Sequence, residues 1–258
     1  MTKNRQTKET PVAALAGNPN VGKSTIFNAL TGMRQHTGNW PGKTVSLAQG
    51  VCMYKGEEIR LVDLPGTYAL VSKSQEETLA AGFISGGEAD CVIAVCDATS
   101  LERSLILALQ VMELTDRVIV CVNLMDEAQK QGIEIDLAAL SFELGVPVVA
   151  ASASREEGMG ELLEQLRRIL DGFEAPRPRR CGVVSDSIRE SHLGAEALRG
   201  ASGRASDEIA AQFVRRAEEI AKRVVRETRQ DAKTRTLRVD RLLTGKVTGL
   251  LLLAGLLG

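Results

Sequence analysis

The sequence contains few aromatic residues and few histidines. Its 258 residues include one Trp, two Tyr and five Phe, together with only two His. With so few rings the core must be built from aliphatic side chains, which suits an α/β protein. The five cysteines, Cys52, Cys91, Cys96, Cys121 and Cys181, show no spacing typical of a metal site. Three of them lie in Val- and Ile-rich runs, so we expect buried free thiols, as in a reducing cytosol.

The charge is nearly balanced overall but unevenly distributed. Residues 1–176 carry 15 Lys and Arg against 23 Asp and Glu, whereas residues 177–258 carry 17 against 10. The change falls at the Pro- and Arg-rich stretch 174–180, and it predicts a domain boundary there. Residues 1–11 are polar and lack the apolar segment of a secretory signal, so we expect a flexible N-terminus.

Short Val- and Ile-rich runs alternate with helical patterns between residues 12 and 173. The runs cover 12–16, 45–54, 59–63, 91–97, 118–123 and 146–150, and the helical patterns lie near 74–84, 101–113, 137–144 and 159–170. This alternation predicts a doubly wound α/β fold with a six-stranded mixed sheet and helices on both faces. Only residues 55–58 separate the second and third runs, so we expect a hairpin that makes one edge strand antiparallel.

The C-terminal part has a different character. From residue 181 onward strand signals are missing, and the apolar positions Ile209, Phe213, Ile220 and Val224 fit one helix face. We therefore expect a small all-α domain over 174–246, with 194–203 as a loop. Residues 247–258 carry no charge and follow a cationic stretch. They fall short of the roughly 20 residues that cross a bilayer, so they indicate the start of a truncated transmembrane helix, or else an amphipathic or core helix.

Residues 17–25 read Gly-Asn-Pro-Asn-Val-Gly-Lys-Ser-Thr, the pattern of a phosphate-binding loop. An apolar run precedes the loop and a helical pattern follows it. In that context the loop and the helix N-terminus surround a phosphate group, Lys23 reaches the β- and γ-phosphates, and the Ser24 hydroxyl binds Mg²⁺. The alternative is a chance Gly-rich turn.

Two acidic motifs follow the phosphate-binding loop at strand ends. Asp63-Leu-Pro-Gly66 closes the third run, where the carboxylate can hold Mg²⁺ through water and the Gly66 N–H can meet the γ-phosphate. Asn123-Leu-Met-Asp126 closes the fifth run. Its Asp can accept from the ring N–H and the exocyclic amine of guanine, which adenine does not offer. Asp126 therefore favours a guanine nucleotide, and Asn123 would tie this loop to the phosphate-binding loop.

Two further loops complete the expected site. Thr44 lies in the segment His36-Thr-Gly-Asn-Trp-Pro-Gly-Lys-Thr44, where its hydroxyl can reach Mg²⁺ and its N–H the γ-phosphate; a hydrophilic connection is the alternative. Ser152-Ala153, after the sixth run, fits a loop whose Ala153 N–H meets the base oxygen. The residues assigned to the nucleotide are Gly17, Asn18, Pro19, Asn20, Val21, Gly22, Lys23, Ser24, Thr25, Gly42, Thr44, Asp63, Gly66, Asn123, Asp126, Ser152 and Ala153.

These motifs, in this order, resemble a Ras-like GTPase, and more closely the cytosolic part of the ferrous-iron transport protein B (FeoB) family. The resemblance is carried by residues 17–25, by Gly38-Asn-Trp-Pro-Gly-Lys-Thr44, by Asp63-Leu-Pro-Gly-Thr-Tyr-Ala-Leu70 and by the apolar tail. It implies a bacterial Fe²⁺ transporter whose GTP-hydrolysing domain and helical GDI-like domain face the cytoplasm at the inner membrane. Lys43 departs from the family, which usually has an apolar residue there.

The resemblance also implies a mechanism and partners. Thr67 stands where Ras-like enzymes carry the water-orienting Gln, so we expect slow intrinsic hydrolysis. Related GTPases bind K⁺ through an Asn that matches Asn20. The expected catalytic residues are Asn20, Lys23, Thr44 and Gly66. The expected cofactors are GTP or GDP, Mg²⁺ and K⁺. The expected partners are the chain's own membrane domain, small regulatory Feo proteins and a second copy of the chain, without nucleic acid.

Two other functions remain open. One is a GTPase of the same class that acts on RNA, for which the basic C-terminal part could serve as the binding appendage. The sequence offers few aromatic residues among those basic residues, which disfavours this function. The other is a nucleotide-binding docking switch with negligible turnover, which Thr67 would permit.

Overall fold

The fold is described from a computed structural model, over residues 10–32, 35–39, 46–70, 74–191, 194–200 and 204–227. Within these residues a seven-stranded sheet has the order β2-β3-β4-β1-β5-β6-β8. Its central strands are parallel, and β3 pairs antiparallel with both β2 and β4. The strands are β1 (Val12–Gly17), β2 (Gln35–Asn39), β3 (Ser46–Tyr54), β4 (Glu57–Asp63), β5 (Cys91–Asp97), β6 (Val118–Asn123) and β8 (Val148–Ala150).

All six predicted strands are present in this sheet, and the predicted hairpin joins β3 to β4 through the turn at Lys55 and Gly56. The prediction that an antiparallel strand of the hairpin lies at the edge was wrong, because β2 pairs outside β3. The sequence of β2, Gln-His-Thr-Gly-Asn, has no apolar run to announce a strand. The strand is recognised in the structure by its backbone pairing with β3.

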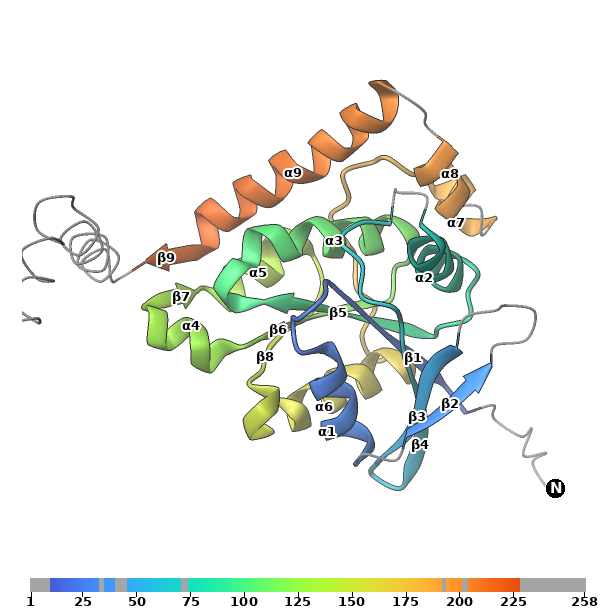
Figure 1. Ribbon diagram of the computed structural model, residues 1–258, viewed down its shortest axis with the longest axis vertical. Helices are drawn as coiled ribbons and strands as arrows, with labels where there is room; N and C mark the ends of the chain where they lie inside the picture. The colour runs from blue at the N-terminus through green and yellow to red at the C-terminus, as the bar shows by residue number, and fades with distance from the viewer. Residues whose placement is uncertain are drawn as a thin grey trace, which may run out of the picture.

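The sheet is covered by helices on both faces, as Figure 1 shows. One face carries α2 (Gln75–Ser85), α3 (Leu101–Leu114) and α5 (Leu137–Leu144), and the other carries α1 (Lys23–Thr31) and α6 (Met159–Leu170). Strand β5 contacts both layers, since Val92 and Ala94 pack on the first face while Cys91 and Ile93 pack on the second. Strands buried on two sides need apolar residues at every position, which is why these runs were visible in the sequence.

The long helix α9 (Arg204–Val224) packs on α3 and α5 and shares their core. Its predicted apolar face is confirmed: Phe213, Ile220 and Val224 are buried, and Ile209 is half-buried. Polar contacts add to this packing. Glu143 of α5 accepts from Arg216 Nη2 at 3.0 Å and from Arg223 Nη1 at 2.8 Å. Through these contacts α9 is fixed against the same layer of helices that covers the sheet.

Two predictions about the C-terminal part were wrong. The stretch expected as a loop contains α8 (Gly194–Gly200), which buries Ala195 and Leu198. The region expected to lack strands ends in β9 (Val225–Glu227), which pairs antiparallel with β7 (Ile133–Ile135). Both elements are short, and their formation depends on partners distant in the sequence. The remaining helices are α4 (Met125–Gln131) and α7 (Asp186–Glu190), with 3-10 turns at Ala98–Ser100 and Ala153–Arg155.

The cysteines behave as expected. All five are free; Cys52, Cys91, Cys96 and Cys121 are buried and Cys181 is half-buried. Burial raises the pKa of Cys52 to about 11, so its thiol stays protonated near neutral pH. In the part of the chain described above, no helix is long and apolar enough to cross a membrane. The predicted start of a transmembrane helix, 247–258, lies outside that part, and the domain boundary near residue 174 stays a prediction.

Candidate functional site

The phosphate-binding loop connects the end of β1 to the start of α1, at the carboxyl edge of the sheet. Asn20 and Gly22 have left-handed backbone angles, with φ of 68° and 80°. A Cβ on Gly22 would lie 2.3 Å from Nδ2 of Asn123, so only glycine fits at that point. Lys23 opens α1, whose first-turn N–H groups have no partners within the helix. The loop thus has the shape and the free donors that a phosphate group requires.

Lys23, Ser24 and Asp63 meet at the ends of neighbouring elements. Strand β4 runs parallel to β1 and ends in Asp63. The Lys23 ammonium forms an ion pair with Asp63 and donates to the Leu64 carbonyl at 2.6 Å. The Ser24 hydroxyl donates to Asp63 Oδ2 at 3.1 Å. A hydroxyl and a carboxylate oxygen are hard donors of the kind that Mg²⁺ prefers, so these residues fit the ion that the sequence predicts.

The segment after Asp63 lies directly against the phosphate-binding loop. A Cβ on Gly66 would lie 3.4 Å from the Pro19 Cα, and the Thr67 N–H donates to the Gly17 carbonyl at 3.3 Å. The far end of the segment is fixed to α3, where the Leu70 N–H donates to the Gln110 Oε1 at 2.5 Å. Gln110 is buried, and no sequence motif pointed to it. This segment is therefore held at both ends beside the loop.

Asn123 connects the phosphate-binding loop to the loop after β8. Its Nδ2 donates to the Val21 carbonyl at 2.9 Å, and its Oδ1 accepts from the Ala153 N–H at 3.0 Å. The side chain is buried, so both hydrogen bonds are shielded from water. One amide thus aligns three of the predicted loops.

Asp126 lies in the first turn of α4, where its N–H donates to Ser152 Oγ at 3.2 Å. Its Oδ1 is buried and has no hydrogen-bond partner in the described structure. A buried acceptor without a partner is costly, and the ring N–H and amine of guanine are donors that would satisfy it. Leu124, two residues before Asp126, has a left-handed conformation with φ 65°, which is uncommon for a leucine. The orphaned oxygen supports the predicted guanine contact.

Not every predicted site residue can be placed. Gly42 and Thr44 lie outside the described residues. Asn18 is buried, with an Oδ1 that has no partner in the described structure, whereas Asn20 and Thr25 are exposed. Among the residues described, no group of three or more His, Cys, Asp or Glu side chains is arranged to hold a metal ion.

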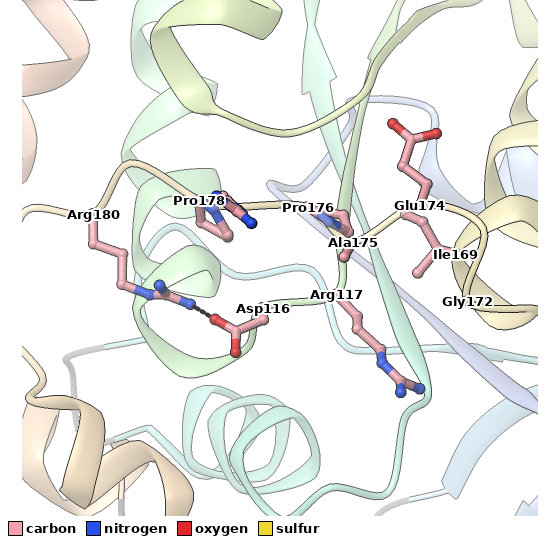
Figure 2. A pocket seen from close by; sticks show the side chains of 10 residues that line it. Asp116, Arg117, Ile169, Gly172, Glu174, Ala175, Pro176, Pro178 and Arg180 are labelled. Atoms are coloured by element: carbon pink, nitrogen blue, oxygen red, sulfur yellow. Dashed lines mark hydrogen bonds and ion pairs between the residues drawn. The ribbon is translucent and has the colours of Figure 1, made fainter.

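A separate cavity of about 440 Å³ lies at the opposite edge of the sheet. Figure 2 shows it between the loop before β6 and the segment 174–180. Arg180 forms an ion pair with Asp116 there, and its Nε donates to the Met112 carbonyl at 2.6 Å. Asp116 precedes β6 whereas Asn123 ends it, so the length of this strand separates the cavity from the phosphate-binding loop.

Fold and site together define a class. A phosphate-binding loop after β1, an Asp-x-x-Gly segment after β4 and an Asn-x-x-Asp loop after β6, on a mostly parallel sheet, make a guanine-nucleotide-binding domain of the P-loop type. Known proteins narrow the class to one family. The family model described as ferrous iron transport protein B matches residues 11–166. The chain belongs to this family, and the matched residues form its N-terminal G domain.

Relatives and solved structures agree with this assignment. The Fe(2+) transporter FeoB of Escherichia coli K12 is 44% identical over 165 residues, which cover 62% of this chain and 21% of that protein. The chain thus spans about a fifth of the relative's length. The cytosolic domain of the T. maritima FeoB iron transporter in a GDP form gives a TM-score of 0.72 at 31% identity, covering 84% of this chain and 100% of that one. The cytosolic domain of L. pneumophila FeoB gives 0.72 at 32% identity, covering 83% and 99%.

Proposed function

We propose that the chain is the GTP-hydrolysing switch domain of a bacterial ferrous-iron transporter, facing the cytoplasm. In this proposal its nucleotide state gates Fe²⁺ passage through a membrane domain that this sequence does not include. The observation that supports it most is the gathering of Lys23, Ser24 and Asp63 beside the loop that carries Asn123 and Asp126. These groups can bind both ends of a guanine nucleotide.

Each side chain has a separate task. Lys23 binds the β- and γ-phosphate oxygens, and Asp126 accepts from the guanine base. Ser24, Thr44 and Asp63 would hold Mg²⁺, which would neutralise charge on the phosphates. Gly66 lies beside Pro19 of the phosphate-binding loop, so its N–H can donate a hydrogen bond to the γ-phosphate. Loss of that phosphate would release the segments that contain Thr44 and Gly66, and this is the switch.

Hydrolysis by these residues alone is expected to be slow. The water-orienting Gln of Ras-like enzymes is replaced by Thr67, which is buried and whose N–H is bonded to the Gly17 carbonyl. Asn20 is exposed on the rim of the phosphate-binding loop. We propose that its side-chain oxygen helps to hold a K⁺ ion that adds positive charge beside the phosphates. The charge of this K⁺ ion would compensate for the absence of the water-orienting Gln in GTP hydrolysis.

The test is steady-state GTP turnover in K⁺ and in Na⁺, with ATP as the control nucleotide. We expect turnover of GTP only, faster in K⁺, and no K⁺ effect in Asn20→Ala. Since Asn20 has φ 68°, an alanine there also strains the backbone. Asn20→Gly removes the same side chain without that strain, and it should lose the K⁺ effect as well. Equal rates in the two salts would exclude the K⁺ site, and guanine binding without turnover would leave only a docking switch.

The transport role needs the full-length gene product. We propose that the membrane domain is the direct partner of this chain, with small Feo proteins and a second copy as further partners. Fe²⁺ uptake by cells that carry the full-length protein should fall when Lys23→Ala removes phosphate binding. Uptake that is unchanged while GTP turnover is lost would contradict the gating role.

A further inference from the structure

The loop after β8 carries Arg155, whose side chain lies beside the Asp126 carboxylate. The Ser152 N–H donates to the Glu157 carbonyl at 3.1 Å, and the Arg155 N–H donates to the Ser152 carbonyl at 2.8 Å. Glu156 and Gly158 have positive φ angles of 59° and 83°. These bonds and angles define a tight loop whose backbone fixes the direction in which the Arg155 side chain leaves it.

Arg155 points at Asp126. Its Nε lies 3.4 Å from Asp126 Oδ2. The Asp126 side chain is only 10% exposed, whereas that of Arg155 is 50% exposed. The two oxygens of the Asp126 carboxylate therefore have different surroundings. Oδ2 faces the Arg155 guanidinium, whereas Oδ1 is buried and has no hydrogen-bond partner in the described structure. An ion pair with a mostly buried carboxylate fixes its rotation more firmly than one on an open surface.

We propose that Arg155 is a positioning residue for guanine recognition: by pairing with Oδ2 it turns Oδ1 of Asp126 toward the base. The inference rests on the proposed function, since it concerns the same nucleotide. Leu124, the residue after Asn123 in the same loop as Asp126, brings no charge. Arg155 supplies a cation to this site from a different loop.

A second cation makes a matched control possible. Lys130 Nζ lies 3.7 Å from the same Oδ2, one helical turn from Asp126, and its side chain is 66% exposed. An exposed i,i+4 pair holds its carboxylate weakly, so its loss should change GDP affinity no more than about twofold. Lys130→Gln and Arg155→Gln remove the same charge from the same oxygen, and only the second removes the pairing from the loop.

The experiment measures binding of GDP and of IDP, which lacks the 2-amino group, to wild type and to both variants by titration calorimetry. For Arg155→Gln we expect about tenfold weaker GDP binding and a markedly smaller loss for IDP, since a misaligned carboxylate loses its contact with the 2-amino group. Arg155→Lys should recover most of the GDP affinity. Lys130→Gln should stay within about twofold of wild type for GDP.

Three results would overturn the proposal: unchanged GDP affinity in Arg155→Gln, equal losses for GDP and IDP, or an equal effect of Lys130→Gln. Thermal unfolding of each variant separates a folding defect from a binding defect. The wild-type titration in the same series tests the proposed function independently, because a chain that does not bind GDP at all would fail there first.

Discussion

The carboxylate of Glu113 is fully buried on α3 and binds the chain that follows the G domain. Its Oε1 accepts from the N–H groups of Cys181 at 2.6 Å and Gly182 at 3.0 Å, and its Oε2 accepts from the Val184 N–H at 3.0 Å. A hydrogen bond to a charged group contributes about 1.5–3 kcal/mol, and each buried N–H left without a partner costs about 1–3 kcal/mol.

We therefore expect Glu113→Ala to lower the free energy of unfolding by about 4 kcal/mol. Glu113→Gln should cost about half as much, because the amide oxygen can keep two of the bonds while its NH₂ group faces the Val184 N–H. The measurement is urea denaturation followed by far-UV circular dichroism. Hydrogen exchange at the amides of Cys181, Gly182 and Val184 gives a local readout, since each should lose protection.

Glu102 provides the matched control, because it lies on the same helix and is exposed. Glu102→Ala should change stability by no more than about 0.5 kcal/mol. If Glu113→Ala behaves like this control and the exchange rates of the three amides stay as in wild type, then Glu113 does not anchor the segment and the argument from burial is wrong.

Two further predictions concern the packing of α9 and the loop after β8. The hydrogen bond from Arg223 holds the pKa of Glu143 below its ordinary value of 4.5, so the charged side chain stabilises the fold above that pH and the stabilisation is lost as pH falls through the lowered pKa. Glu143→Gln should therefore unfold at lower urea than wild type at neutral pH, and the difference should shrink in acid; a pH-independent difference would contradict this cause. Gly158→Ala should lower stability by about 2 kcal/mol or more in thermal unfolding, because the residue has φ 83° and a Cβ would lie 2.1 Å from the Ala150 carbonyl oxygen. Gly160→Ala, in the open first turn of α6, is its control and should not destabilise.

The central strands could be predicted because burial on both faces imposes continuous apolar runs, as in 91–97 and 118–123. Elements whose formation depends on a distant strand or helix could not be predicted. β2 and β9 pair with strands elsewhere, and α8 depends on Ala195 and Leu198 packing against distant helices. Their own sequences carry too few apolar residues to form a recognisable pattern.

The same distinction applies to the site. Asp63, Asn123 and Asp126 could be found because each lies at or just after the end of a strand, within a short motif of fixed spacing. Gln110 and Arg155 could not, since they act on Leu70 and Asp126 across loops that only the folded chain brings together. Side chains that position others belong to no local pattern.

Helix α3 carries buried polar side chains that each accept backbone N–H groups from a different segment. Ser104 accepts from the Asp97 N–H at 3.1 Å, Gln110 from Leu70, and Glu113 from residues 181–184. Apolar contacts alone fix the position of a helix along its axis less sharply than hydrogen bonds do, because they are not directional. Sliding α3 by a single turn would leave all of these N–H groups without acceptors at once. The helix therefore fixes the axial alignment of the strand end, the Asp63–Leu70 segment and the start of the C-terminal helices, and any movement among them must take α3 along as a rigid body or break a buried hydrogen bond.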